Sequence, residues 1–130
     1  MAIGLASGVA NAWLDAICNA TNYTAPVGFF VKLHTADPGA SGATAAAGNT
    51  TRQSASMAAA SGGAITSDAA VTWTNVSTTE TYSHVSFWSA VSGGTFIGSD
   101  DLAVAQAVTA GNTFTIAIGD LDITLTAIAA

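Results

Sequence analysis

Residues 81–89 read TYSHVSFWS and form the most clearly patterned stretch of this 130-residue sequence. Successive side chains of an extended chain point to opposite sides, so Val85 and Phe87 share one face, while the other face carries every second residue from Tyr82 to Trp88. Both faces therefore bear large apolar groups. This pattern is typical of a strand in the middle of a sheet that is covered on both sides.

Working outward from this stretch, other short alternating segments are separated by turn sequences. The expected strands are residues 29–35, 52–60, 69–74, 95–98, 113–118 and 121–126. Residue types that favour tight turns stand at Asp37-Pro38-Gly39, Ser92-Gly93-Gly94, Ala110-Gly111-Asn112 and Gly119-Asp120. Such a series indicates an all-β fold, an antiparallel β-sandwich of jelly-roll-like type, over residues 28–126. Residues 36–50 are expected to form a loop, and Asp100 and Asp101 to mark another.

The N-terminal segment, residues 1–20, is expected to add a short α-helix over residues 7–19 to a chain that forms one domain over residues 1–130. Ser7 is the expected N-cap of this helix and Asn19 its expected end.

The helical pattern contains one apolar stripe. Val9, Trp13 and Ile17 follow one another at intervals of four residues, which places them on one side of the helix. This stripe must be buried, either within the domain, which is the favoured arrangement, or against a neighbouring subunit. Together with the preceding apolar residue it forms the candidate assembly interface, which consists of Leu5, Val9, Trp13 and Ile17.

The charge of the chain excludes several kinds of partner. The formal net charge is −6, and Lys32 and Arg52 are the only basic residues. Such a chain cannot neutralise a row of phosphates, so nucleic acid is excluded as a partner. An anionic membrane surface would repel it, and no run of about 18 apolar residues could span a bilayer. The N-terminus lacks the basic start of a signal peptide, which favours synthesis in a cytoplasm.

The histidines and the cysteine indicate no catalytic or metal site. His34 and His84 are far apart in the sequence and lack the spacing of a metal motif, so both are expected to be partly buried and hydrogen-bonded in strands. Cys18 follows an apolar helix position and is expected to be a small buried side chain, because nothing beside it suggests a nucleophile.

The acidic residues Asp100, Asp101, Asp120 and Asp122 have two chemical interpretations. Paired carboxylates could hydrolyse a glycoside, or ligate Ca²⁺ with loop carbonyls. Solvated turn and surface acids are the favoured interpretation. We therefore expect no enzyme activity, no catalytic residues, no cofactor and no metal.

Several ordered blocks of the sequence resemble a family of small proteins from tailed bacteriophages, commonly labelled tail fibre, minor tail or virion proteins. The blocks are LHTADPG at 33–39, TRQ at 51–53, ASGG at 60–63, HVSFW at 84–88, SGGTFIG at 92–98, VTAGNT at 108–113 and GDL at 119–121. The resemblance covers about residues 29–126. It implies a structural part of the virion, without catalytic residues, that is made in the cytoplasm of the bacterial host.

Two placements in the particle remain open. The favoured one is a minor capsid protein that decorates the shell by subunit packing, with trimers as one arrangement. The alternative is a minor tail or tail-fibre-associated protein. The expected partners are other copies of the chain and the major capsid or tail proteins. A carbohydrate-binding module for the host surface is a further alternative; its aromatic contacts would come from Trp73, Tyr82, Trp88 or Tyr23.

Overall fold

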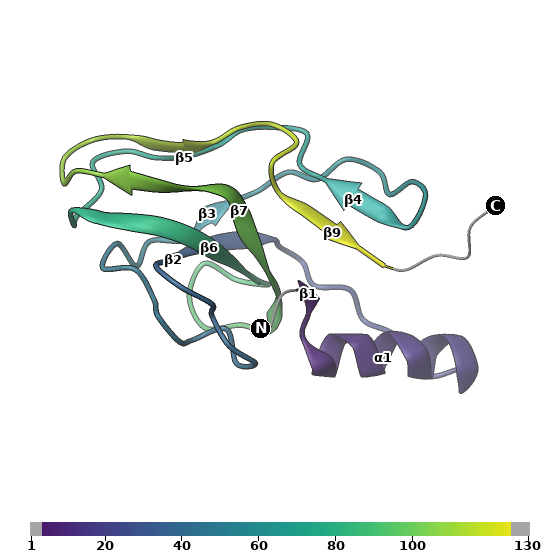
Figure 1. The fold of residues 1–130 in the computed structure, drawn as a ribbon. Coiled ribbons are helices and arrows are strands. Elements are labelled where there is room, and N and C mark those ends of the chain that lie inside the picture. The colour runs from purple at the N-terminus through teal and green to yellow at the C-terminus, as the bar shows by residue number, and fades with distance from the viewer. Residues whose placement is uncertain (1–3, 126–130) are drawn as a thin grey trace.

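The computed structural model describes residues 4–125 and shows a mainly β fold with one helix at its N-terminal side (Figure 1). The elements in chain order are β1 (Gly4–Leu5), α1 (Ser7–Cys18), β2 (Phe30–His34), β3 (Gln53–Ser54), β4 (Ala64–Thr66), β5 (Val71–Trp73), β6 (Glu80–Trp88), β7 (Phe96–Val108), β8 (Phe114–Ile116) and β9 (Asp122–Thr124). A five-stranded sheet has the order β1-β7-β6-β2-β3, and two small sheets pair β4 with β9 and β5 with β8. All pairs are antiparallel. The expected all-β sandwich with a short N-terminal helix is confirmed.

Strand β6 is the centre of the large sheet, as the pattern of residues 81–89 predicts. It pairs with β2 on one side and with β7 on the other. Its Val85 and Phe87 are fully buried in a core shared with the small β5–β8 sheet, which contributes Trp73 and Phe114. Tyr82 was expected on the opposite face, but it joins the same core through an edge contact with Phe114. The register shift between Tyr82 and His84 accounts for this difference.

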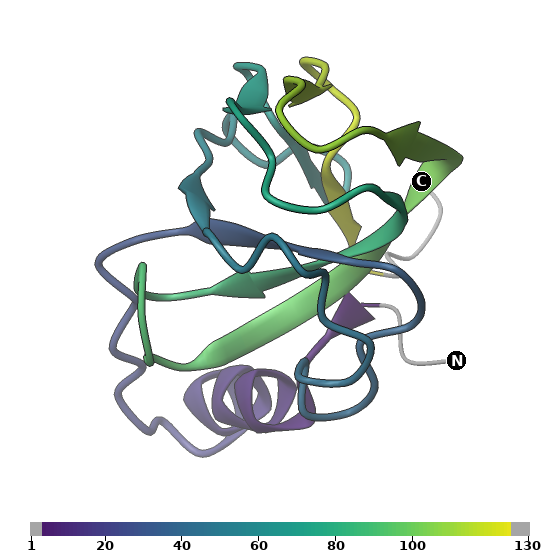
Figure 2. The same cartoon turned by 90° about the vertical axis from the view of Figure 1, so that its left-hand side faces the viewer.

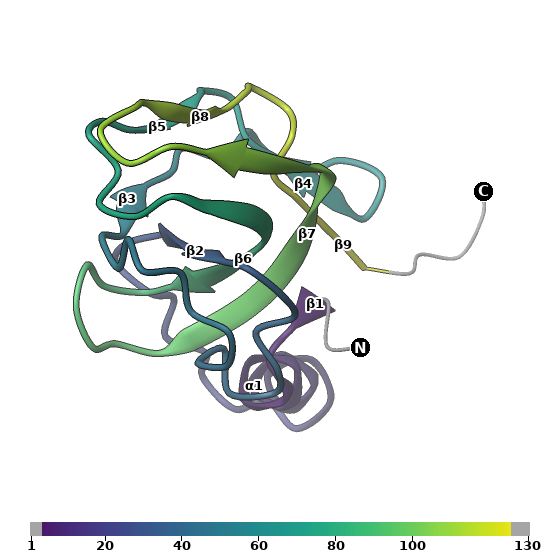
Figure 3. The same ribbon diagram turned by 60° about the vertical axis from the view of Figure 1, so that its left-hand side comes forward.

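The second face of β6 is covered by the segment between β2 and β3, which is the expected loop 36–50. His34 donates from Nδ1 to the carbonyl oxygen of Thr44 at 2.8 Å, and Thr35 N–H donates to Ala45 O at 3.0 Å. Figure 3 shows this segment running across the strands. A sheet covered on both sides is therefore obtained without a second helix or a further strand layer.

Strand β7 differs most from the expectation. The sequence predicts a short strand at 95–98 and then a loop at Asp100 and Asp101, whereas one strand runs from Phe96 to Val108. Residues 102–105 have no partner in β6, because the register passes from Asp101 opposite His84 to Gln106 opposite Tyr82. Such a bulge bends a strand, and Figure 1 shows β7 turning sharply. Aspartate is rare in strands. A loop was therefore expected at Asp100 and Asp101, where β7 in fact continues.

Several other strands are shorter than the sequence pattern predicts. The strand expected at 52–60 is reduced to β3 and an isolated bridge between Met57 and Ser67, because its alanines and serines have little surface to bury. The strands expected at 69–74, 113–118 and 121–126 are the shorter β5, β8 and β9, and Thr126 lies outside the described residues.

Helix α1 begins at Ser7, so the expectation that Ser7 is the N-cap is wrong. Ala6 occupies that position in an extended conformation, and no side chain caps the helix. Asn19 ends the helix as expected, and its N–H donates to Asp15 O at 2.9 Å. The helix lies beside one end of the strands, to which β1 connects it (Figures 1 and 2). Within residues 4–125 no helix has the length and apolar character needed to cross a membrane.

Candidate assembly surface around the N-terminal helix

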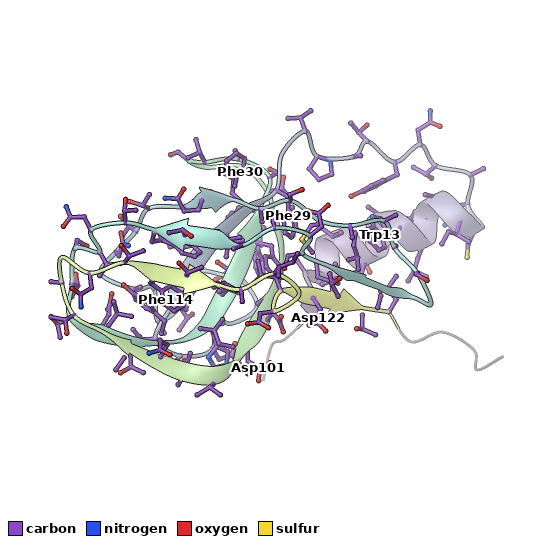
Figure 4. All side chains as sticks on the ribbon, turned by 90° about the horizontal axis from the view of Figure 1, so that it is seen from above. Trp13, Phe29, Phe30, Asp101, Phe114 and Asp122 are labelled. Atoms are coloured by element: carbon purple, nitrogen blue, oxygen red, sulfur yellow. The ribbon has the colours of Figure 1, made fainter. Side chains whose placement is uncertain are left out.

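Three of the four candidate interface residues line one apolar groove between α1 and the strands. Leu5, Val9 and Trp13 form its helix side. The opposite side is formed by residues from the strands and their connections, which are Phe29, Met57, Ile65, Ile97 and Ile123. Figure 4 shows Trp13 and Phe29 close together between the helix and the strands. The groove encloses about 450 Å³, so the helix does not close tightly onto the body.

A second hollow of about 770 Å³ adjoins this groove and shares Val9, Tyr23 and Ile97 with it. Tyr23 lies edge-on to Trp13, with the ring centroids 6.0 Å apart. Phe96 lines the far side of the hollow. Aromatic and aliphatic groups therefore continue along the whole inner side of the helix and its following segment.

Ile17, the fourth candidate residue, lies one turn beyond Trp13, does not line the groove and is 80% exposed. Leu14 is 59% exposed, Val27 is fully exposed and Tyr23 is also exposed. These three residues were not predicted as part of the surface. Leu14 stands three residues before Ile17, a spacing that puts them on one side of a helix, so a second stripe could have been found in the sequence. Large contiguous apolar patches on a protein surface mark interaction sites.

The attachment of α1 to the rest of the molecule is slight. Val9 is the only residue of the helix that is buried. Strand β1 contributes two register pairs, Gly4 with Ser99 and Leu5 with Gly98, and Ala6 N–H donates to Ile97 O at 2.8 Å. A Cβ atom on Gly98 would collide with the carbonyl oxygen of Gly4, so this close pairing requires glycine at position 98.

The two histidines lie in neighbouring strands, and His84 is half-buried and hydrogen-bonded to the Ser83 hydroxyl as expected. His34 and His84 are directly opposite each other in β2 and β6, and Asp101 of β7 is opposite His84. Nothing in the sequence pattern indicates this row of side chains. No group of three metal-ligating side chains that could hold a metal ion occurs within residues 4–125. His34 is fully buried, beyond the partial burial that was expected, and burial lowers its pKa.

His34 belongs to a directional hydrogen-bond chain. Because Thr44 O can only accept, Nδ1 carries the proton and Nε2 accepts from the Ser86 hydroxyl at 2.7 Å. Ser86 Oγ in turn accepts from Trp88 Nε1 at 2.8 Å. A serine beside a histidine can be a nucleophile, but both side chains are wholly enclosed. The contact satisfies buried polar groups and holds the loop against the sheet.

Asp100 contradicts the expectation of solvated acids. It is buried, and its carboxylate accepts from Asp101 N–H at 2.9 Å and from Asp122 N–H at 3.3 Å. Burial and the negative charge of Asp122 raise the pKa of Asp100 to about 6, while the two N–H groups oppose this shift. Asp101, Asp120 and Asp122 are exposed as expected.

The remaining candidates also have definite places. Cys18 is exposed, so its expected burial is wrong, because it lies on the outer side of the last helical turn. Of the aromatic residues proposed for carbohydrate binding, Trp73 and Tyr82 are buried. One face of Trp88 is covered by the Arg52 guanidinium, 4.1 Å from the ring centroid. Tyr23 alone is exposed.

The sequence matches the family of podophage GP4 fiber I protein gp80 over residues 4–124. The chain belongs to this fibre protein family. No protein with a curated description matches it. The resemblance to tailed-phage virion proteins is confirmed, and the match places the chain among structural proteins of the phage particle.

Membership in the fibre family bears on the two placements. It supports the fibre-associated alternative better than capsid decoration, for which neither the match nor the fold provides support. The match also includes β1 and α1, whereas the resemblance read from the sequence began only at about residue 29. The part of the chain that forms β1 and α1 therefore belongs to the region matched by the family.

Proposed function

We propose that the chain is a non-enzymatic subunit of a phage fibre that joins neighbouring fibre subunits through the surface around α1. The observation that carries this proposal is the apolar groove beside α1, whose lining includes the exposed Val27, together with the exposed Leu14 and Ile17 on the helix. Charged residues are depleted in the cores of interfaces, and Asp15 is the only charged residue of the helix.

The polar side chains that could take part in catalysis are buried and hydrogen-bonded, which supports a structural role. The Ser86–His34 pair is buried, and the buried Asp100 carboxylate is occupied by two backbone N–H groups. Catalysis needs reactive groups in an accessible pocket. The two hollows beside α1 are lined mainly by apolar and hydroxyl-bearing side chains, with no acid, histidine or cysteine among their lining residues.

The composition of the phage particle tests the placement. Gold-labelled antibody against the protein should decorate the fibres, and quantitative mass spectrometry of purified particles should give a few to a few dozen copies. Hundreds of copies, with label over the shell, would support capsid decoration instead. Absence of the protein from purified particles would refute a structural role altogether.

The surface itself is tested by changing Ile17→Asp in the phage genome. A carboxylate in an apolar interface must be desolvated, so we expect particles that lack the protein while the soluble subunit remains folded. Val104→Asp is the matched control, because Val104 is 75% exposed on β7 and lines neither hollow beside α1. If both variants are incorporated into particles equally well, the helix surface does not join the subunits, and this part of the proposal is wrong.

A further inference from the structure

The N-terminal arm, defined here as β1 and α1 (residues 4–18), has few contacts with the body formed by the strands. Its helix buries one side chain, Val9, and its strand pairs through Gly4 and Leu5. The main element contacts of the arm are those of β1 with β7 and β9. Leu5 and Trp13 are only half-buried, so few fully buried apolar groups hold the arm in place.

The linker that follows the arm is long and exposed. All residues from 19 to 27 are exposed, and none belongs to a helix or strand. The backbone N–H groups of Asn19 and Thr21 bond to Asp15 O within the arm. An extended chain spans about 3.3 Å per residue, so the linker can reach roughly 30 Å. The arm can therefore be placed at a distance from its own body.

The site that receives the arm is shaped for it. Gly98 in β7 leaves room for the Gly4 carbonyl, and Ile97 O accepts from Ala6 N–H. The groove accommodates Leu5, Val9 and Trp13. Every copy of the chain presents the same receiving site, so the arm of a second copy would find identical contacts there.

We propose that the arm is exchanged between copies of the chain, with β1 and α1 of one subunit seated on β7 and in the groove of the next. This deepens the proposed function and rests on it, because the exchange would be the contact that joins fibre subunits. Exchange of an identical element costs little, since the same contacts form between subunits as within one. It would also bring the exposed Leu14, Ile17 and Val27 of the arm and linker next to a second subunit.

A disulfide engineered between arm and body shows whether the arm binds to the body of its own subunit or to that of another subunit. Ala6 is opposite Ile97 by continuation of the β1–β7 register, and the Cα atoms of directly opposed residues are about 4.5–5.5 Å apart, a separation that a disulfide can bridge. We would introduce Ala6→Cys and Ile97→Cys together with Cys18→Ser, oxidise the full-length protein, and run a denaturing gel without reductant. Exchange predicts covalent dimers or larger species, whereas covalent monomers alone would overturn the proposal.

The matched control is a second cross-strand pair in the same background. Thr72 and Thr115 are opposite each other in β5 and β8, with their Oγ1 atoms 3.1 Å apart. Thr72→Cys with Thr115→Cys should give only monomers, because both strands belong to the body. Intermolecular bands from this pair would show that random oxidation produces the oligomers, and they would overturn the assignment to the arm.

Sedimentation decides the question if the first pair does not oxidise. Exchange requires the wild-type protein to associate, and Gly98→Ala should reduce its mass to that of a monomer while the far-ultraviolet spectrum of the strands persists. A wild-type protein that is monomeric at every concentration would overturn the proposal, and so would association that Gly98→Ala leaves unchanged. These measurements use the purified protein and are independent of its location in the particle. Failure of the exchange would therefore be distinguishable from failure of the fibre assignment.

Discussion

At the scale of single residues, the buried Ser86 hydroxyl links the side chains of Trp88 and His34. It accepts from Trp88 Nε1 and donates to His34 Nε2, so it satisfies two buried nitrogen atoms. Each buried polar atom left without a partner costs about 1–3 kcal/mol. Ser86→Ala should therefore lower the free energy of unfolding by about 2–4 kcal/mol, measured by denaturant titration.

Tyr82→Phe is the control for this prediction. Tyr82 is on the same strand and equally buried, but its hydroxyl makes no hydrogen bond within the described residues, although the Asn49 and Glu80 side chains are near. Removing an unsatisfied hydroxyl should leave the stability unchanged or raise it slightly. A loss for Tyr82→Phe as large as that for Ser86→Ala would contradict the importance of the hydrogen-bond chain.

Asp100 predicts how stability changes with pH. Its pKa is about 6 in the folded protein, against 3.8 for an unperturbed carboxyl. The folded state therefore binds the proton more tightly than the unfolded state, so the protein gains stability as the pH falls from about 7.5 towards 4.5. One pKa unit corresponds to about 1.4 kcal/mol, which makes the gain on the order of 2 kcal/mol.

The test compares unfolding of the wild type and Asp100→Asn across this pH range. The amide carries no charge beside Asp122, so the variant should be more stable near pH 7.5 and should lose most of the pH dependence. Asp120→Asn, at an exposed position of the next turn, should keep the slope of the wild type. If Asp100→Asn keeps that slope as well, another group is responsible for it.

At the scale of elements, the loop that covers β6 makes one close contact with the ring of Phe96 in addition to its hydrogen bonds. Gly42 has a φ of +69°, and a Cβ atom there would lie 2.5 Å from the Phe96 ring. Gly42→Ala should therefore lift the loop and cost about 2–4 kcal/mol, the sum of left-handed backbone strain and a displaced ring. Gly62→Ala isolates the first contribution, because Gly62 has a φ of +60° and open space around it.

We expect Gly62→Ala to cost about 1 kcal/mol in the same denaturant titration. Hydrogen exchange supplies a second readout, because protection of the Thr35 and Ala47 amides, which donate to Ala45 O and Leu33 O, should fall in Gly42→Ala and stay unchanged in Gly62→Ala. Equal losses of stability in the two variants would show that the Phe96 contact does not hold the loop.

The elements also show which features a sequence can predict. Periodicity identified β2, β6 and α1, because each alternates or repeats over at least five residues against a real core. It failed at β7, whose Asp100 is stabilised by N–H groups from Asp101 and from distant Asp122. The same limit applies to the assembly surface. Leu5, Val9, Trp13 and Ile17 could be named, but only the fold reveals that three line a groove and one faces solvent.

At the scale of the whole molecule, the net negative charge of the chain determines how its stability responds to salt. The chain has eight acids and two bases, and the bases are neighbours: burial and, after it, the positive charge of Arg52 lower the pKa of Lys32. Arg52 Nη1 bonds to the carbonyl oxygens of Ala90 and Gly93 rather than to a carboxylate. Net repulsion therefore dominates, and salt should stabilise the fold by screening it.

Raising sodium chloride from about 20 mM to 0.5 M shortens the screening length from roughly 20 Å to about 4 Å. We expect Tm to rise by a few degrees in calorimetry, since one kcal/mol corresponds to roughly 2–8 °C in a domain of this size. Lys32→Glu replaces +1 by −1 and takes the net charge from −6 to −8, so its Tm should increase more steeply with salt. Potassium chloride should act equally, because screening depends on ionic strength. A Tm that falls with salt in both proteins would mean that attractive ion pairs outweigh repulsion, and it would contradict this prediction.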